Sequence, residues 1–219
     1  LSIGFDPNLF TNKSLLNLFG KNRFNLKKIY KNLIDKIWKR KIVKSKNKFY
    51  LLPNKDPKRK LKYGLEIIKS RNNLVGINTH MANKITHHAL ENNLIKELRK
   101  NDSIKPEVFF NKETRFDFLI EKNEQKSFVE VKNVTLFRDK YIAEFPDAVT
   151  SRGSKHLLTL IDAIKKGYKS YIIFLVQIQN MKKFKIAKDI DTEYHKNYLM
   201  AKKAGVHFLA YSCLLYTSP

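Results

Sequence analysis

Apolar and polar positions follow two different periods along the first 80 residues of the chain. Residues 24–43 place apolar side chains at three- and four-residue steps with lysines between them, which predicts a basic amphipathic helix. From residue 48 the pattern changes to short β-rich runs, which predict two strands around a turn at residues 53–57 and a further strand at residues 74–79. The sequence therefore predicts a helical start followed by mainly extended chain.

The rest of the chain alternates helical and extended patterns. Residues 79–100 have helical spacing, and Asn78 or Thr79 could cap this helix. The β-rich runs "RFDFLI" and "SFVEVKNVTL" flank the polar turn "EKNEQK" and predict a hairpin. Two helices, at about residues 151–166 and 191–204, each end at a glycine and lead into the strands "SYIIFLVQIQ" and "VHFLAYS". This order predicts an α/β fold, a sheet with helices packed on it.

Composition narrows the classes of partner. Lys and Arg number 44 against 20 Asp and Glu, a formal charge of +24, which favours a polyanion. Charge alone leaves DNA, RNA and anionic membrane open, but no apolar run reaches the roughly 18 to 20 residues of a membrane span. The start "LSIGFDPNLF" lacks a signal-peptide pattern, so we expect a cytoplasmic location. A single cysteine, Cys213, excludes an intramolecular disulfide and a cysteine-based zinc site.

Three charged residues interrupt the apolar hairpin. Glu130 and Lys132 share one face of their strand, and Asp117 lies in the partner strand, where pairing can bring it alongside. Two carboxylates and a backbone carbonyl such as that of Val131 suit Mg²⁺ or Mn²⁺, which could polarise a phosphodiester. Lys132 could then orient or deprotonate the attacking water, or neutralise charge on the phosphate. The alternative is a cross-strand ion pair on a solvated face.

Basic residues elsewhere suggest contacts with a nucleic acid backbone. The turn "PNKDPKRK" concentrates positive charge beside extended chain, although a solvated turn explains it equally well. The helix expected from residue 151 carries basic side chains on its first turns, where free backbone N–H groups also favour phosphate. A histidine on that helix could contact phosphate or pack internally. We therefore expect DNA contacts at Lys58, Arg59, Lys60, Arg152, Lys155 and His156.

The segments "TRFDFL", "FVEVKNVTL", "FPDAVTSRGSKHLLTL" and "GVHFLAY" resemble the sugar fermentation stimulation protein A family, and the resemblance covers roughly residues 50–211. It implies an α+β protein with a small N-terminal OB-like β domain and a C-terminal PD-(D/E)XK nuclease-like domain, a mixed sheet flanked by helices. Such proteins are described as DNA-binding and linked to sugar-utilisation genes. The resemblance implies that the nuclease-motif positions are Asp117, Glu130 and Lys132, and that the site is also lined by Asp147, Arg152, Lys155 and His156.

The chain departs from the family pattern at both ends. Residues 1–47 are basic and helix-like where the family begins with strands, so we expect the OB-like domain of residues 1–79 to be incomplete or altered. The nuclease-like domain is expected over residues 80–212. The tail "CLLYTSP", residues 213–219, resembles translated adapter sequence and is expected to be non-native.

Another departure concerns the predicted metal site. His88 stands where the resemblance implies an acidic residue, for which Glu97 or Glu107 could compensate. Two functions stay open: a Mg²⁺-dependent nuclease acting on DNA, with a homodimer as one way to cut both strands, and a non-catalytic DNA-binding regulator. An RNA-binding protein, which would stack unpaired bases on exposed aromatic side chains, is a third.

Overall fold

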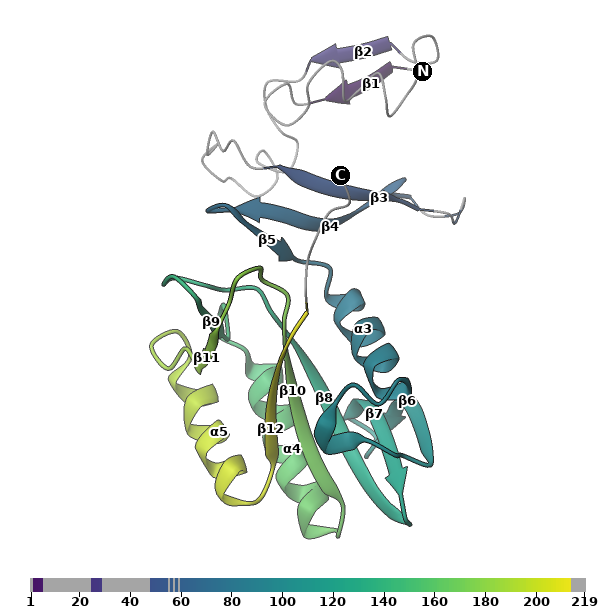
Figure 1. Cartoon of the computed structure of the whole chain (residues 1–219), viewed down its shortest axis with the longest axis vertical. Helices are drawn as coiled ribbons and strands as arrows, with labels where there is room; N and C mark the ends of the chain where they lie inside the picture. The colour runs from purple at the N-terminus through teal and green to yellow at the C-terminus, as the bar shows by residue number, and fades with distance from the viewer. Residues whose placement is uncertain are drawn as a thin grey trace. The chain divides into compact units, whose positions relative to one another are not determined.

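The computed structural model describes residues 2–5, 25–28, 48–54, 56, 58 and 60–213, and it is drawn in Figure 1. The chain separates into two compact units, residues 1–72 and 73–219. Residue 79, at which the sequence pattern changes, is the first residue of a helix in the second unit.

The described part of the first unit is extended chain. Strands β1 (Ser2–Phe5) and β2 (Asn25–Lys28) pair in parallel. Strands β3 (Phe49–Pro53) and β4 (Tyr63–Ser70) pair antiparallel, as the two β-rich runs predict.

The helix predicted for residues 24–43 is wrong where it can be compared with the structure. Residues 25–28 form strand β2, and the other residues of the predicted helix lie outside the described ones. Pairing with β1 gives this short segment hydrogen-bond partners from another part of the chain. Periodicity in a single sequence does not report such partners, and tertiary context overrides helix propensity.

The second unit is built on a five-stranded mixed sheet with the strand order β12-β10-β8-β7-β6. The central strand β8 pairs antiparallel with β7 and parallel with β10, and β10 pairs parallel with β12. Strand β6 pairs antiparallel with β7 at the other edge. The strands are β6 (Ser103–Phe109), β7 (Arg115–Lys122), β8 (Gln125–Val134), β10 (Lys169–Val176) and β12 (His207–Ser212).

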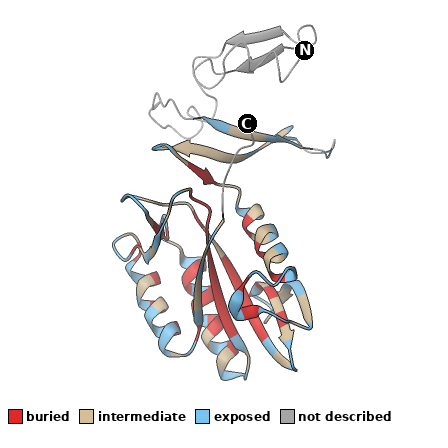
Figure 2. Ribbon diagram, viewed as in Figure 1, coloured by how far each residue is buried: buried red, intermediate tan, exposed pale blue. Residues whose placement is uncertain are grey.

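Helices cover both faces of this sheet (Figure 1). Val129 and Val131 of β8 belong to a buried cluster with Ala82 and Leu90 of α3 (Thr79–Glu91). Glu130, whose side chain points to the opposite face, contacts α4 (Ser151–Lys165) instead. Helix α5 (Thr192–Lys203) packs beside α4. Figure 2 shows that burial is concentrated in the central strands and on the helix surfaces facing them.

Several short elements complete the unit. Strand β5 (Asn73–Gly76) precedes α3, and the 3-10 helix η1 (Lys96–Leu98) follows it. Helix α3 therefore ends at Glu91, earlier than the predicted residue 100. Strands β9 (Ile142–Phe145) and β11 (Lys183–Ile186), which the sequence did not predict, form a two-stranded parallel sheet.

A buried charge fixes this small sheet. Glu144 of β9 is fully buried, and both of its carboxylate oxygens accept hydrogen bonds from Arg138 at 2.7 Å. Lys185, its neighbour on β11, lies 3.2 Å from the same carboxylate, and Arg138 also pairs with Asp189. Because a buried charge is tolerated only when it is paired, this network ties β9, β11 and their loops together.

Candidate metal and phosphate site

The β7–β8 hairpin places the first two candidate carboxylates. Pairing runs from Phe118 opposite Val129 to the end of the hairpin. Just beyond the last pair, Asp117 Oδ2 accepts a hydrogen bond of 2.7 Å from the backbone N–H of Val131. The Asp117 side chain therefore continues the contact between the two strands where backbone pairing stops, which brings it beside Glu130.

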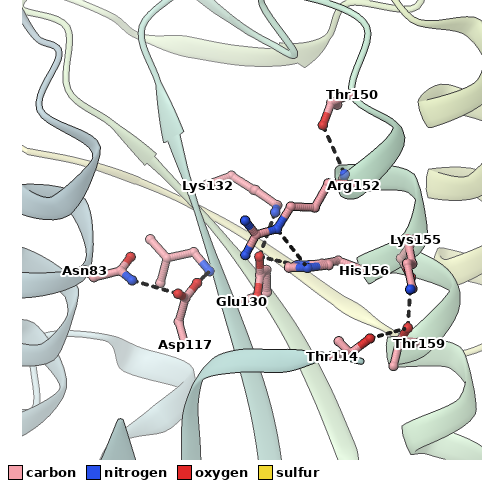
Figure 3. Close-up of polar contacts among 12 residues, drawn as sticks. Asn83, Thr114, Asp117, Glu130, Lys132, Thr150, Arg152, Lys155, His156 and Thr159 are labelled. Carbon is pink, nitrogen blue, oxygen red and sulfur yellow. Dashed lines mark hydrogen bonds and ion pairs between the residues drawn. The ribbon is translucent and has the colours of Figure 1, made fainter. Parts of the chain in front are cut away.

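Glu130 is the most buried charged group of the site, with 4% of its surface exposed. Its Oε1 lies 2.7 Å from the Lys132 ammonium and 2.5 Å from His156 Nδ1 (Figure 3). Its other oxygen, Oε2, is buried and has no hydrogen-bond partner among the described residues. A buried carboxylate oxygen without a partner is costly, and a cation can compensate for it.

Helix α3 reaches the site from the other side. Asn78 caps this helix, because its side-chain oxygen accepts a hydrogen bond of 3.1 Å from the backbone N–H of His80. One turn further on, the Asn83 amide donates to Asp117 Oδ1 at 2.7 Å. Both oxygens of Asp117 thus accept one hydrogen bond, and each keeps a lone pair that could bind a cation.

The start of α4 supplies the basic side. The Thr150 hydroxyl caps the helix by accepting from Gly153 N at 3.0 Å, and the Thr150 N–H donates to Asp191 at 2.8 Å. This cap sets the direction of the first turns, from which Arg152 and His156 point toward Glu130 (Figure 3). The Arg152 Nε lies 3.5 Å from His156 Nε2, so the two side chains are held together.

These side chains surround a cavity of about 800 Å³, which we call the main cavity. Its lining includes predicted catalytic, metal-binding and neighbouring residues: Glu107, Asp117, Glu130, Val131, Lys132, Asp147, Arg152 and His156. Segments that are far apart in the sequence meet here, because the hairpin, α3 and α4 each contribute one wall.

Some predicted residues lie elsewhere. Lys155 is on α4 but outside the main cavity, and its ammonium pairs with Glu113 at 2.7 Å. Glu97 does not reach the cavity either, because α3 ends before it and its carboxylate accepts a hydrogen bond from Tyr211 at 2.5 Å. Lys58 and Lys60 are exposed in the first unit, and Arg59 lies outside the described residues.

Sequence reasoning missed two main-cavity residues on α3. His80 and Asn83, neither of which was predicted to belong to the site, both line it. They are three residues apart at the start of a predicted helix, a spacing that puts both on one side of it. That polar pair was the available signal, but only the packing of α3 shows that it faces Asp117.

The pKa values of the two carboxylates shift in opposite directions. Burial, together with the nearby Glu130 carboxylate, raises the pKa of Asp117 from 3.8 to about 6, although the hydrogen bonds that it accepts act against this. Burial also acts to raise the pKa of Glu130, but Lys132 and His156 hold it below its usual value. Glu130 is therefore the charged member of the pair, and Asp117 retains a proton more readily.

The donor set fits a hard cation with few protein ligands. No group of three or more His, Cys, Asp or Glu side chains within the described part of the chain is arranged to hold a metal ion. Two carboxylates remain, one of which has an unsatisfied buried oxygen. Mg²⁺ commonly binds through one or two carboxylates and takes its remaining ligands from water and phosphate.

Comparisons with known proteins agree with this architecture. The family model described as "Sugar fermentation stimulation protein RE domain" matches residues 80–218. A sugar fermentation stimulation protein homolog of Pelagibacter ubique is 72% identical over 167 residues, which are 76% of this chain and 72% of that relative. A homolog of Pseudoalteromonas atlantica is 41% identical over 169 residues, covering 76% of this chain and 72% of the relative.

A solved structure matches as well. The structure of Pyrococcus furiosus SfsA in complex with Ca²⁺ superimposes with a TM-score of 0.69 at 29% identity, over 75% of this chain and 69% of that one. None of the described helices is long and apolar enough to cross a membrane. On the family model and these relatives together, the chain belongs to the sugar fermentation stimulation protein family.

Proposed function

We propose that this protein binds DNA and hydrolyses phosphodiester bonds with a divalent metal ion held in the main cavity. In this proposal residues 80–212 have the PD-(D/E)XK nuclease fold implied by the resemblance of the hairpin motif. The observation that carries the proposal is the buried Oε2 of Glu130, which has no partner among the described residues and lies beside a second carboxylate and a lysine. An ion pair between Glu130 and Lys132 that served only the fold would not require a buried carboxylate oxygen without a partner.

Asp117, Glu130 and the backbone carbonyl of Val131 would hold the ion, with Mg²⁺ or Mn²⁺ as the expected metals. The Ca²⁺ in the Pyrococcus furiosus relative supports a divalent cation in this family. A bound divalent ion would polarise the phosphate and lower the pKa of a bound water. It would also satisfy the unpaired oxygen of Glu130.

Lys132 and the first turns of α4 would act on the phosphate. The Lys132 side chain is 14% exposed and held 2.7 Å from Glu130, so its ammonium has a fixed position at the cavity. There it would orient the attacking water or offset the negative charge that gathers on the phosphate. Arg152, which also lines the cavity, would bind a phosphate oxygen.

The experiment compares wild type with Lys132→Ala in DNA binding and in cleavage of plasmid and single-stranded DNA, in buffers with Mg²⁺ or Mn²⁺. We expect cleavage to fall at least about a hundredfold in the variant, while DNA affinity changes little. Lys126→Ala, an exposed lysine on the same strand, is the matched control and should keep both activities.

The alternative, a DNA-binding regulator without catalysis, gives a different result. Wild type would then bind DNA without cutting it under any metal condition, and Lys132→Ala would show only a small, salt-dependent loss of affinity. That outcome would contradict the hydrolytic part of the proposal.

A further inference from the structure

A second cavity of about 620 Å³, here called the side cavity, shares Arg115, Arg152 and His156 with the main cavity. We propose that the side cavity binds an unpaired nucleobase next to the scissile phosphate, so that the substrate is single-stranded or frayed nucleic acid. This inference rests on the proposed function and specifies its substrate class.

An exposed aromatic side chain carries the inference. Phe109, at the end of β6, lines the side cavity and is 64% exposed. The next residue, Phe110, instead packs edge-on against Phe128 in the interior. The aromatic core thus does not account for Phe109, and an exposed ring beside a phosphate site is the usual platform for stacking a base.

The Arg115 side chain lies over the ring of Phe109. Arg115 is the cross-strand partner of Phe109, and its guanidinium carbon lies 5.6 Å from the centre of the Phe109 ring. The guanidinium group also pairs with Glu107 at 2.8 Å. Bases stack on aromatic rings and on arginine planes alike, so either member of the pair can take a base.

The opposite wall suits the phosphate that follows such a base. Ser151, Arg152 and Lys155 line the side cavity from the first turns of α4. Lys155 is paired with Glu113, but both side chains are more than half exposed, and such a pair is weak enough for a phosphate to replace the carboxylate. Arg152 lies at the border of both cavities, where adjacent phosphates of one strand could reach it.

This arrangement predicts a preference between nucleic acid forms. Bases in a duplex are stacked inside the helix, and presenting one to Phe109 requires unpairing it. A single strand, a frayed end or a flap presents its bases without that penalty. The side cavity should therefore favour such ends over intact duplex.

The test compares two single-stranded oligothymidylates of equal length, one intact and one with abasic sites, in metal-free buffer. Their phosphate charge is the same, so a difference in affinity reports the bases alone. We expect wild type to bind the intact strand about tenfold more tightly, the order of one stacked base. Phe109→Leu should lose this difference, whereas Phe109→Trp should keep it.

Tyr141→Leu is the matched control, because Tyr141 is also an exposed aromatic with lysines at 4.9 Å but lines neither cavity. It should discriminate as wild type does. Equal binding of both strands by wild type, or unchanged discrimination in Phe109→Leu, would overturn the inference. The proposed hydrolysis is tested separately, since metal-dependent cleavage of plasmid or single-stranded DNA by wild type does not depend on how Phe109→Leu binds the two strands.

Glu113→Gln gives an independent check on the phosphate wall. Removing the carboxylate that pairs with Lys155 should tighten binding of both strands about threefold, because a phosphate then no longer has to displace the Glu113 carboxylate from the Lys155 ammonium. Unchanged or weaker binding in this variant would contradict the placement of a phosphate at Lys155.

Discussion

Glu130 shows how one residue can serve both the fold and the site. Its Oε1 pairs with Lys132 and His156, and these two contacts compensate for part of the cost of burying a charge. Its Oε2 stays buried without a partner among the described residues. The carboxylate is thus fixed in position while one of its oxygens remains available for a cation.

Replacing Lys132 by methionine should destabilise the protein as well as abolish hydrolysis. The variant keeps most of the aliphatic stem but leaves Glu130 with only His156 as a partner, and removing one member of a buried ion pair is strongly destabilising. We expect the free energy of unfolding to fall by about 2 kcal/mol, measured by urea denaturation at neutral pH. Lys155→Met, which breaks the exposed pair with Glu113, should change it by less than about 1 kcal/mol. Equal losses in the two variants would contradict the role assigned to burial.

Replacing Asp117 by asparagine should have the opposite effect on stability. The pKa of Asp117 is raised to about 6 in the folded protein, so folding favours the protonated carboxyl. That stabilisation is complete below about pH 4 and is lost as the pH rises through about 6. The neutral asparagine avoids the cost of ionising the buried carboxyl, and the Asn83 amide can turn so that its oxygen accepts from the new NH2 group. At pH 7.5 the substitution should therefore stabilise the metal-free protein, by up to about 2 kcal/mol, while metal binding is lost.

The measurement is urea denaturation of both proteins between pH 4 and 8. The stability difference between them should grow through this interval as wild-type Asp117 ionises. A difference that does not change with pH would contradict the raised pKa. Metal affinity of wild type should also decline below about pH 6, because the ion must displace a proton.

At the scale of elements, the start of α4 depends on a glycine. A Cβ on Gly153 would lie 2.8 Å from Thr150 Oγ1 and 3.2 Å from a ring carbon of the fully buried Tyr194. Gly153→Ala should therefore lower the free energy of unfolding by about 1–2 kcal/mol, although alanine is the better helix former. Cleavage should fall as well, because the displaced turn carries Arg152 and His156.

A double-mutant cycle tests whether a clash with Thr150 causes the loss of stability in Gly153→Ala. Thr150→Ala alone should cost about 1 kcal/mol through loss of the helix cap, measured by urea denaturation. In the Gly153→Ala background the same change should cost little or even stabilise, because it removes the atoms that clash. Additive losses would show that Thr150 is not what the new methyl group meets.

Most elements of the second unit could be predicted because their signals are local. The hairpin has alternating burial in β7 and a continuous buried run in β8, joined by a short polar turn, and α4 ends where Gly167 adopts a positive φ of 87°. Strands β9 and β11 are different, since each has four residues and its partner is distant in the sequence. Strand β2 was mistaken for helix for the same reason: its pairing partner is outside any local window.

The candidate site was predictable in part, for a related reason. Asp117, Glu130 and Lys132 belong to one hairpin, and the pleat of its strands brings them together. The contacts of Asn83 with Asp117 and of His156 with Glu130 depend on how helices pack on opposite faces of the sheet. Helix packing leaves no comparable mark on the spacing of single residues, which is why His80 and Asn83 of α3 were not assigned to the site.

At the scale of the whole molecule, the net charge of +24 should control binding to DNA. Each phosphate that the protein neutralises releases counterions, so affinity falls steeply with salt. If six or more phosphates are contacted, duplex affinity should fall at least about a thousandfold between 50 and 200 mM salt. Fluorescence anisotropy over this range measures the slope. An affinity that hardly changes would contradict a backbone-directed interface.

The central claim is that Asp117 and Glu130 hold a divalent ion for phosphodiester hydrolysis. Its most direct test is calorimetric titration of Mg²⁺ and Mn²⁺ into wild type and Asp117→Ala, with cleavage of plasmid and single-stranded DNA assayed in the same buffers. We predict that wild type binds metal and cleaves only when metal is present, and that Asp117→Ala does neither. Absence of metal binding up to millimolar concentrations, with DNA affinity intact and no cleavage, would contradict the claim.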